Sequence, residues 1–330
     1  MASVLESRPV HPVKGDRPRK RRNVVSRATL QDLHERALAA HQESRFIEAY
    51  DLFGQLVPLA RNCLRVDYLA WVLRSLGEAA VFMGNHSVAA SALMEAASLC
   101  ENLDDHGGHA HCIFLLGQIA ANECRADDAE ILFERSGEIA EKAGDQAGVA
   151  VSLRARGEIA AWRRESDRAA EILFKARRAF VAIEDRYGEA SVLQVLARVQ
   201  ATLGRIQSAQ KCLGEALELA NAIGDPQVKA CVLLNIGAFC ADWRGAEGAE
   251  NALNEAMALF HQTGDRLGQA QCHGTLATAC SRLRKYDDAS NSLAIAQEIY
   301  LELGNPAKVA VVSAQMAYVL VAQGNCARRP

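Results

Sequence analysis

The amino-acid sequence predicts an all-α fold, built as a solenoid of about seven helix pairs followed by one further helix. Three observations lead to this prediction. No proline lies between Pro58 and Pro226, and only 5% of the 330 residues are aromatic, a composition that favours helices over strands. Small and large residues recur with a period of 40. Pairs of Gly with Asp or Asn, which favour helix ends, recur every 40 or 80 residues.

Four columns of residues keep the 40-residue period in phase. The first is always Ala, the second Gly or Ala, the third Leu or Phe, and the fourth Ala or Ser. They run through Ala49, Ala89, Ala129, Ala169, Ala209, Ala249 and Ala289; Ala37, Gly77, Gly117, Gly157, Ala197, Gly237, Ala277 and Ala317; Phe53, Leu93, Phe133, Leu173, Leu213, Leu253 and Leu293; and Ala96, Ser136, Ala176, Ala216, Ala256 and Ala296. We expect the small residues to let two helices approach, and the large one to fill the space between units.

The Gly-Asp and Gly-Asn pairs divide the chain into these units. They stand at Gly144-Asp145, Gly224-Asp225-Pro226, Gly264-Asp265 and Gly304-Asn305-Pro306. Glycine suits the left-handed backbone that ends a helix, and Asp or Asn caps the next one. Glu184-Asp185 lacks the glycine, so we expect a less sharp junction there. The predicted pairs are 25–64, 65–104, 105–144, 145–184, 185–224, 225–264 and 265–304, with a capping helix at about 305–323.

The spacing within a unit carries a family resemblance. Gly77 precedes Ala89 by 12 residues, Leu93 by 16 and Ala96 by 19, and Leu76-Gly77 recurs as Leu116-Gly117. In this pattern, from about residue 28 to 323, the chain resembles the tetratricopeptide repeat family. Its period is 40 rather than 34, similar to the long repeats of kinesin light chains and of sensor arrays in bacterial transcription activators. The resemblance implies a right-handed α-solenoid.

The resemblance also implies where a ligand binds, namely on the concave wall lined by the first helix of each pair. The residues expected there lie at positions 71, 74 and 78 and at 40-residue steps from them: Trp71, Arg74, Glu78, His111, Phe114, Gln118, Arg154, Glu158, Gln194, Arg198, Leu234, Gln271 and Thr278. Trp71 and Phe114 are candidates to anchor an apolar side chain, and the three arginines are candidates to bind carboxylates or phosphates. The repeated Lys and Asn of the chaperone-tail carboxylate clamp are missing, so we do not predict that ligand.

The two ends of the chain do not join the repeat. We expect residues 1–27 to be a disordered basic arm, 28–323 the repeat solenoid and 324–330 a tail. Eight basic and two acidic residues among the first 30 give a charge of +6, so the remaining residues must carry −9 to reach the net −3. The basic run is a solvated tail in the default interpretation, with nuclear import or an anionic surface as alternatives. It consists of Arg17, Arg19, Lys20, Arg21 and Arg22.

The sequence shows neither a secretion signal core nor an apolar run of membrane-spanning length. We therefore expect a cytoplasmic protein with no membrane insertion, or a nuclear one if the source is eukaryotic. Its ten cysteines are expected to be free thiols. With a net charge of −3, nucleic acid is an expected partner only through the basic arm.

One short segment, 104–112, combines three His, one Cys and two Asp. His106, His109 and Cys112 are candidate metal ligands, but the segment coincides with a junction between units and has no second ligand pair. A structural junction is the preferred interpretation. Phosphate-binding loops, dinucleotide fingerprints and nucleophile motifs are absent from the sequence, so we predict no cofactor and no enzymatic activity.

The resulting functional prediction is a protein–protein interaction module, an adaptor or assembly scaffold, that binds a peptide or protein segment in its concave groove. Two alternatives stay open. One is a signal-sensing regulatory array that binds a small ligand or peptide, and the other is a metal-binding protein that uses the segment from His106 to Cys112. The sequence does not indicate the oligomeric state or the partner.

Overall fold

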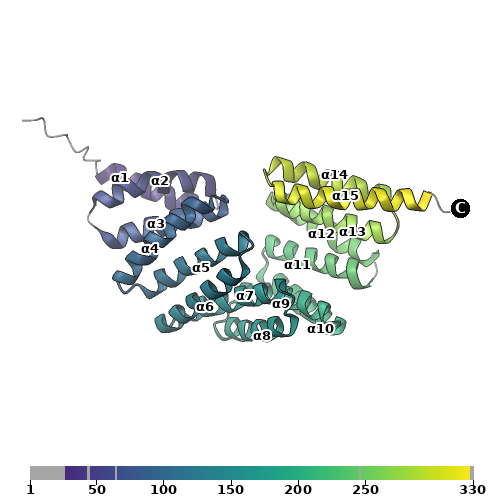
Figure 1. Cartoon of the computed structure of the whole chain (residues 1–330), viewed down its shortest axis with the longest axis horizontal. Coiled ribbons are helices and arrows are strands. Elements are labelled where there is room, and N and C mark those ends of the chain that lie inside the picture. Colours follow the sequence, from purple (N-terminus) through teal and green to yellow (C-terminus); the bar gives the residue numbers. More distant parts are fainter. Residues whose placement is uncertain (1–26, 43–44, 64, 245–246, 328–330) are drawn as a thin grey trace, which may run out of the picture.

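The chain is a curved row of helices in a computed structural model that describes residues 27–42, 45–63, 65–244 and 247–327 (Figure 1). The helices are α1 (Arg27–Gln42), α2 (Phe46–Asn62), α3 (Val66–Phe82), α4 (His86–Asn102), α5 (His106–Asn122), α6 (Ala126–Ala143), α7 (Gln146–Trp162), α8 (Ser166–Ala182), α9 (Arg186–Thr202), α10 (Ile206–Ile223), α11 (Pro226–Phe239), the π-helical turn η1 (Cys240–Arg244), α12 (Glu247–Thr263), α13 (Arg266–Arg282), α14 (Tyr286–Glu302) and α15 (Pro306–Ala327). Within the described ranges the structure is helical throughout apart from short connections.

These helices confirm the seven predicted pairs, from α1 with α2 to α13 with α14. In the middle of the row, α7 and α9 lie on the inner side of the curve and α8 and α10 on the outer side (Figure 1). The last helix, α15, continues to Ala327, four residues beyond the predicted end. The basic arm, with Arg17, Arg19, Lys20, Arg21 and Arg22, lies outside the described residues.

Glycines of the second column are the points where the two helices of a unit touch. A Cβ atom added to Gly77 would lie 2.5 Å from Leu93, and one added to Gly157 would lie 2.6 Å from Leu173. Real Cβ atoms do not approach other atoms so closely, so the absence of a side chain sets the distance between the paired helices. The large residue therefore covers the glycine of its own unit, whereas the sequence had placed it between units.

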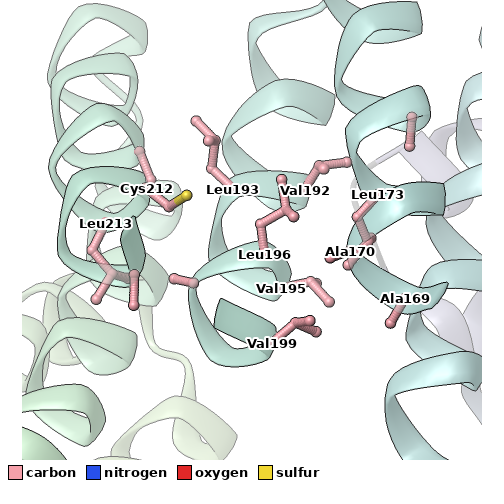
Figure 2. Packing of buried hydrophobic residues seen from close by; sticks show 14 of the residues in the cluster. Ala169, Ala170, Leu173, Val192, Leu193, Val195, Leu196, Val199, Cys212 and Leu213 are labelled. Carbon is pink, nitrogen blue, oxygen red and sulfur yellow. The ribbon is translucent and has the colours of Figure 1, made fainter. Parts of the chain in front are cut away.

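Neighbouring units pack through the other side of the first helix. Val192, Leu193 and Leu196 of α9 are almost completely buried, and they lie between Leu173 of α8 and Leu213 of α10 (Figure 2). Each unit alone would leave such side chains in water, so each stabilises the next along the row.

The junctions between units follow the predicted chemistry, with one correction. Gly144 has a left-handed backbone (φ 72°), and the Asp145 side chain accepts a hydrogen bond from the Gly148 amide at 2.9 Å. Glu184 adopts the same left-handed backbone (φ 58°), and Asp185 caps its helix in the same way. The expectation of a less sharp junction at Glu184 is therefore wrong, because the same backbone hydrogen bonds close both turns, from Asp185 N to the Phe180 carbonyl oxygen at 3.0 Å and from Asp145 N to that of Ala140 at 2.9 Å.

The predicted capping helix α15 is present, and it leaves several large apolar side chains exposed. Val311, Tyr318, Leu320 and Val321 are 55–71% exposed. Terminal helices of repeat arrays usually present a polar outer face. Within the described ranges, no helix is both long and apolar enough to span a membrane.

Candidate functional site

A series of hollows follows the inner wall of the solenoid from α7 to α15. The first, about 280 Å³, lies between α7, α9 and α11, and the second, about 210 Å³, shares Gln194, Arg198 and Asn235 with it. Asn235 and Asp242 continue into a third hollow of about 390 Å³ that reaches α15. We call these three adjoining hollows the C-terminal groove.

The floor of the C-terminal groove is a pair of amide side chains. The Asn235 amide group donates to Gln194 Oε1 at 2.8 Å and to the Cys231 carbonyl oxygen at 2.9 Å. The Gln194 amide group donates to the Ala190 carbonyl oxygen at 3.2 Å. These bonds fix both side chains and connect α9 to α11. Asn235 Oδ1 has no hydrogen-bond donor among the described residues, so it can accept one from a ligand.

The charged side chains of the C-terminal groove differ in whether they have an ion-pair partner. Glu158 is bound to Arg154 at 2.5 Å, and Asp242 is bound to Arg282 at 2.8 Å. Arg198 is exposed between these two carboxylates, and it forms no ion pair with any described residue. The groove therefore presents one guanidinium group whose donors remain available.

Two exposed tryptophans stand at the first two hollows. Trp162, the last residue of α7, lines the first hollow and is 55% exposed. Trp243 lines the second and is 49% exposed. Trp243 belongs to the π-helical turn that follows α11, and such turns widen the helix by one residue and often occur at functional sites. Large exposed aromatic rings of this kind are the usual anchors of protein contacts.

The N-terminal half of the same wall is arranged differently. The Trp71 ring lies 4.9 Å from the ring of His34, 5.6 Å from that of Phe53 and 6.0 Å from that of Tyr68, measured between centroids. Phe114 packs in the same way against Phe133, at 5.2 Å. The two predicted apolar anchors therefore contribute to the packing of the solenoid itself.

The remaining predicted residues of this half surround a partly buried histidine. His111 is half-buried near Glu78 and Arg74, and burial lowers the pKa of its imidazole, with Glu78 opposing the shift. Glu78 Oε2 lies 3.3 Å from His41 Nε2 of α1. Arg74 forms no ion pair with any described residue, and Gln118 is half-buried on α5. These side chains form a polar patch, separate from the C-terminal groove.

The structure thus brings together part of the predicted set. Glu158, Gln194, Arg198 and Gln271 line the C-terminal groove, with Arg154 bound to Glu158. Asn235, Trp162 and Trp243 were missed. Trp162 follows Glu158 by four residues, so it lies one turn further along the same helix face, and extending the predicted face by one turn would have found it.

The candidate metal ligands do not converge. His106 is exposed, His109 is buried, and Cys112 is fully buried beside the thiol of Cys100, which raises the pKa of the Cys112 thiol. No group of three His, Cys, Asp or Glu side chains in the described part of the chain is placed to hold a metal ion. The metal-binding alternative is therefore not supported, because His109 and Cys112 are buried in the packing of α5 whereas His106 is exposed at its start.

One unit of the chain matches a known repeat family directly. The sequence model of the tetratricopeptide repeat matches residues 190–223, which cover most of α9 and α10. No curated protein has a sequence similar enough to match this chain.

Solved structures resemble the chain over most of its length. The apo form of the quorum sensor NprR from B. thuringiensis superposes with a TM-score of 0.70 at 14% identity, covering 82% of this chain and 76% of that one. The apo form of RapI gives a TM-score of 0.62 at 13% identity, covering 91% and 99%. The Rap conjugation gene regulator of the plasmid pLS20, in complex with the Phr* peptide, gives 0.60 at 13%, covering 95% and 80%. Similarity at these identities establishes the helical-array fold.

Proposed function

We propose that this chain, a tetratricopeptide-repeat protein, is a non-enzymatic module that binds a peptide or protein segment in its C-terminal groove. The observation that carries the proposal is the groove itself. Its polar floor, Gln194 and Asn235, is fixed by hydrogen bonds, and its two tryptophans are 55% and 49% exposed. A site that is rigid before binding loses little conformational entropy when a ligand arrives.

The groove suits an extended segment better than a compact small molecule. Its hollows adjoin one another along several first helices instead of forming one enclosed cavity. A segment lying along the wall would place apolar side chains on Trp162 and Trp243, while Asn235 Oδ1 accepts a hydrogen bond from a backbone N–H. The polar contacts would then set the register of the segment and the tryptophans would supply most of the affinity.

The structural comparisons support a peptide as the ligand and keep the regulatory alternative open. One of the similar arrays is a quorum sensor, and another is a gene regulator solved with a bound peptide. On that alternative, the peptide is a signal that changes the curvature of the solenoid. Small-angle X-ray scattering of the full chain with and without a selected peptide distinguishes the two: a scaffold keeps its radius of gyration, and a sensor changes it.

The proposal is tested by selecting binders from a random-peptide display library against the full chain. We expect the selected peptides to lose about tenfold or more in affinity when Trp162 is replaced in Trp162→Ala. The matched control is Phe174→Ala, which removes a 45% exposed aromatic ring from α8, outside the groove. Failure to select any peptide, or equal effects of both substitutions, would contradict the proposal.

A further inference from the structure

The C-terminal groove carries information about the chemistry of its ligand. We propose that Arg198 is a carboxylate-recognition site, so that the preferred ligand is a peptide carrying a carboxylate between two apolar side chains. The carboxylate is that of an Asp or Glu side chain, because a C-terminal carboxylate has no following residue to contact the second tryptophan. This inference rests on the proposed function.

The first argument is the charge of the groove. Arg198 belongs to both of the first two hollows, so it stands at the centre of the stretch between Trp162 and Trp243. The acidic side chains that line these two hollows, Glu158 and Asp242, are each bound to another arginine. Counting these five groups, Arg154, Glu158, Arg198, Asp242 and Arg282, the stretch has a net charge of +1, and Arg198 carries the unpaired charge.

The second argument is geometric. Arg282 donates to Asp242 twice, from Nη2 to Oδ1 at 2.8 Å and from Nη1 to the backbone carbonyl oxygen at 3.0 Å, so Asp242 already has a guanidinium partner. Arg154 similarly holds Glu158 from one turn earlier on α7. Arg198 itself has no carboxylate partner among the described residues, so its planar guanidinium group can bind both oxygens of a carboxylate that the ligand supplies.

The third argument concerns the flanks of the site. Trp162 precedes Arg198 along the wall and Trp243 follows it, and both rings are about half exposed. Apolar side chains resting on these rings would exclude water from the ion pair between them. A charge pair sheltered in this way contributes more to binding than one in open solvent.

The test uses peptides selected on the full wild-type chain from two random libraries, one with free C-termini and one with amidated C-termini. Enrichment of Asp or Glu in the amidated library supports the inference, and binders found only in the free library would overturn it. We expect Arg198→Gln to weaken such a peptide about tenfold or more. The matched control Arg178→Gln, an exposed arginine on α8 that forms no ion pair with a described residue, should leave the affinity unchanged.

A neutral analogue of the selected peptide, with Asn or Gln in place of the carboxylate side chain, completes a double-mutant cycle. Arg198→Gln should have no further effect on its affinity. Peptides that depend on Trp162 but show no carboxylate enrichment and bind Arg198→Gln normally would overturn this inference and leave the proposed function intact. If neither library yields a peptide, the proposed function fails and this inference fails with it. Circular dichroism confirms that each variant is folded.

Discussion

The two halves of the concave wall have the same helical framework and use their aromatic residues in opposite ways. In the N-terminal half, Trp71 is surrounded by His34, Phe53 and Tyr68, and Phe114 packs on Phe133. In the C-terminal half, Trp162 and Trp243 are about half exposed beside an unpaired arginine. Position on the wall is therefore not enough to identify a contact residue. The neighbours decide whether an aromatic ring stabilises the solenoid or remains available to a ligand.

Stability measurements provide the largest expected difference between the halves. Trp71→Ala should lower the free energy of unfolding by about 2–3 kcal/mol, because it removes the centre of an aromatic cluster. Trp162→Ala should change it by less than about 0.5 kcal/mol, since an exposed side chain gives up little packing. Urea unfolding followed by circular dichroism compares the two variants. Equal losses would mean that the halves do not differ in this way.

Peptide binding should be affected in the opposite way, with larger losses for substitutions in the C-terminal half than for those in the N-terminal half. Trp243→Ala is expected to cost a selected peptide about 1–2 kcal/mol of binding free energy, because the peptide loses an aromatic contact surface. Phe114→Ala should leave the binding free energy almost unchanged in molecules that remain folded, since its ring packs against Phe133 and lies outside the C-terminal groove. Isothermal titration calorimetry measures both. A larger loss for Phe114→Ala would place the ligand in the N-terminal half.

The junction at Glu184 allows a test with a smaller expected effect, in which the substitution should stabilise the protein. It asks whether the left-handed backbone at this position has a steric cost that glycine would remove. Glu184→Gly should raise the free energy of unfolding by about 1 kcal/mol, because glycine adopts a left-handed backbone without steric cost. Gly144→Ala at the equivalent junction should lower it by a similar amount. Thermal unfolding of the two variants gives the sign directly, and a destabilised Glu184→Gly would show that the side chain contributes more than the turn costs.

The smallest predicted effect is a dependence of stability on pH in the N-terminal half. Burial lowers the pKa of His111 below its ordinary value of 6.5, with Glu78 opposing the shift and Arg74 and His41 adding to it. The unfolded chain then binds the proton more readily, so stability is complete above about pH 6.5 and falls as the pH drops toward the folded pKa. Urea midpoints between pH 7.5 and 5 should therefore fall less in His111→Gln than in the wild type. Identical slopes would exclude this histidine as a source of the dependence.

The fold could be predicted from the sequence because the residues that recur with the period are the ones that pack against each other. Gly77 and Leu93 touch, as do their equivalents at 40-residue steps in the other units that carry the glycine. Local backbone choices were harder: the period places Glu184 at a junction position but its residue type does not indicate a left-handed backbone, and the π-helical turn at Trp243 has no counterpart in the periodic pattern.

The candidate site was predicted in part for a related reason. Spacing placed Glu158, Gln194 and Arg198 on the wall, and the structure brings them to one groove. The spacing alone could not show which arginine lacks an ion-pair partner, because pairing depends on side-chain rotamers and on the neighbouring helices. The contrast between the paired Arg154 and the unpaired Arg198 appears only in three dimensions.

The placement of the ligand in the C-terminal half is tested most directly by tryptophan fluorescence, because the chain contains three tryptophans, Trp71, Trp162 and Trp243. Three variants, each keeping one of them with Phe at the other two positions, are titrated with a selected peptide. The account predicts a saturable change in emission for the variants that keep Trp162 or Trp243, and none for the variant that keeps Trp71. A response confined to the Trp71 variant would contradict it.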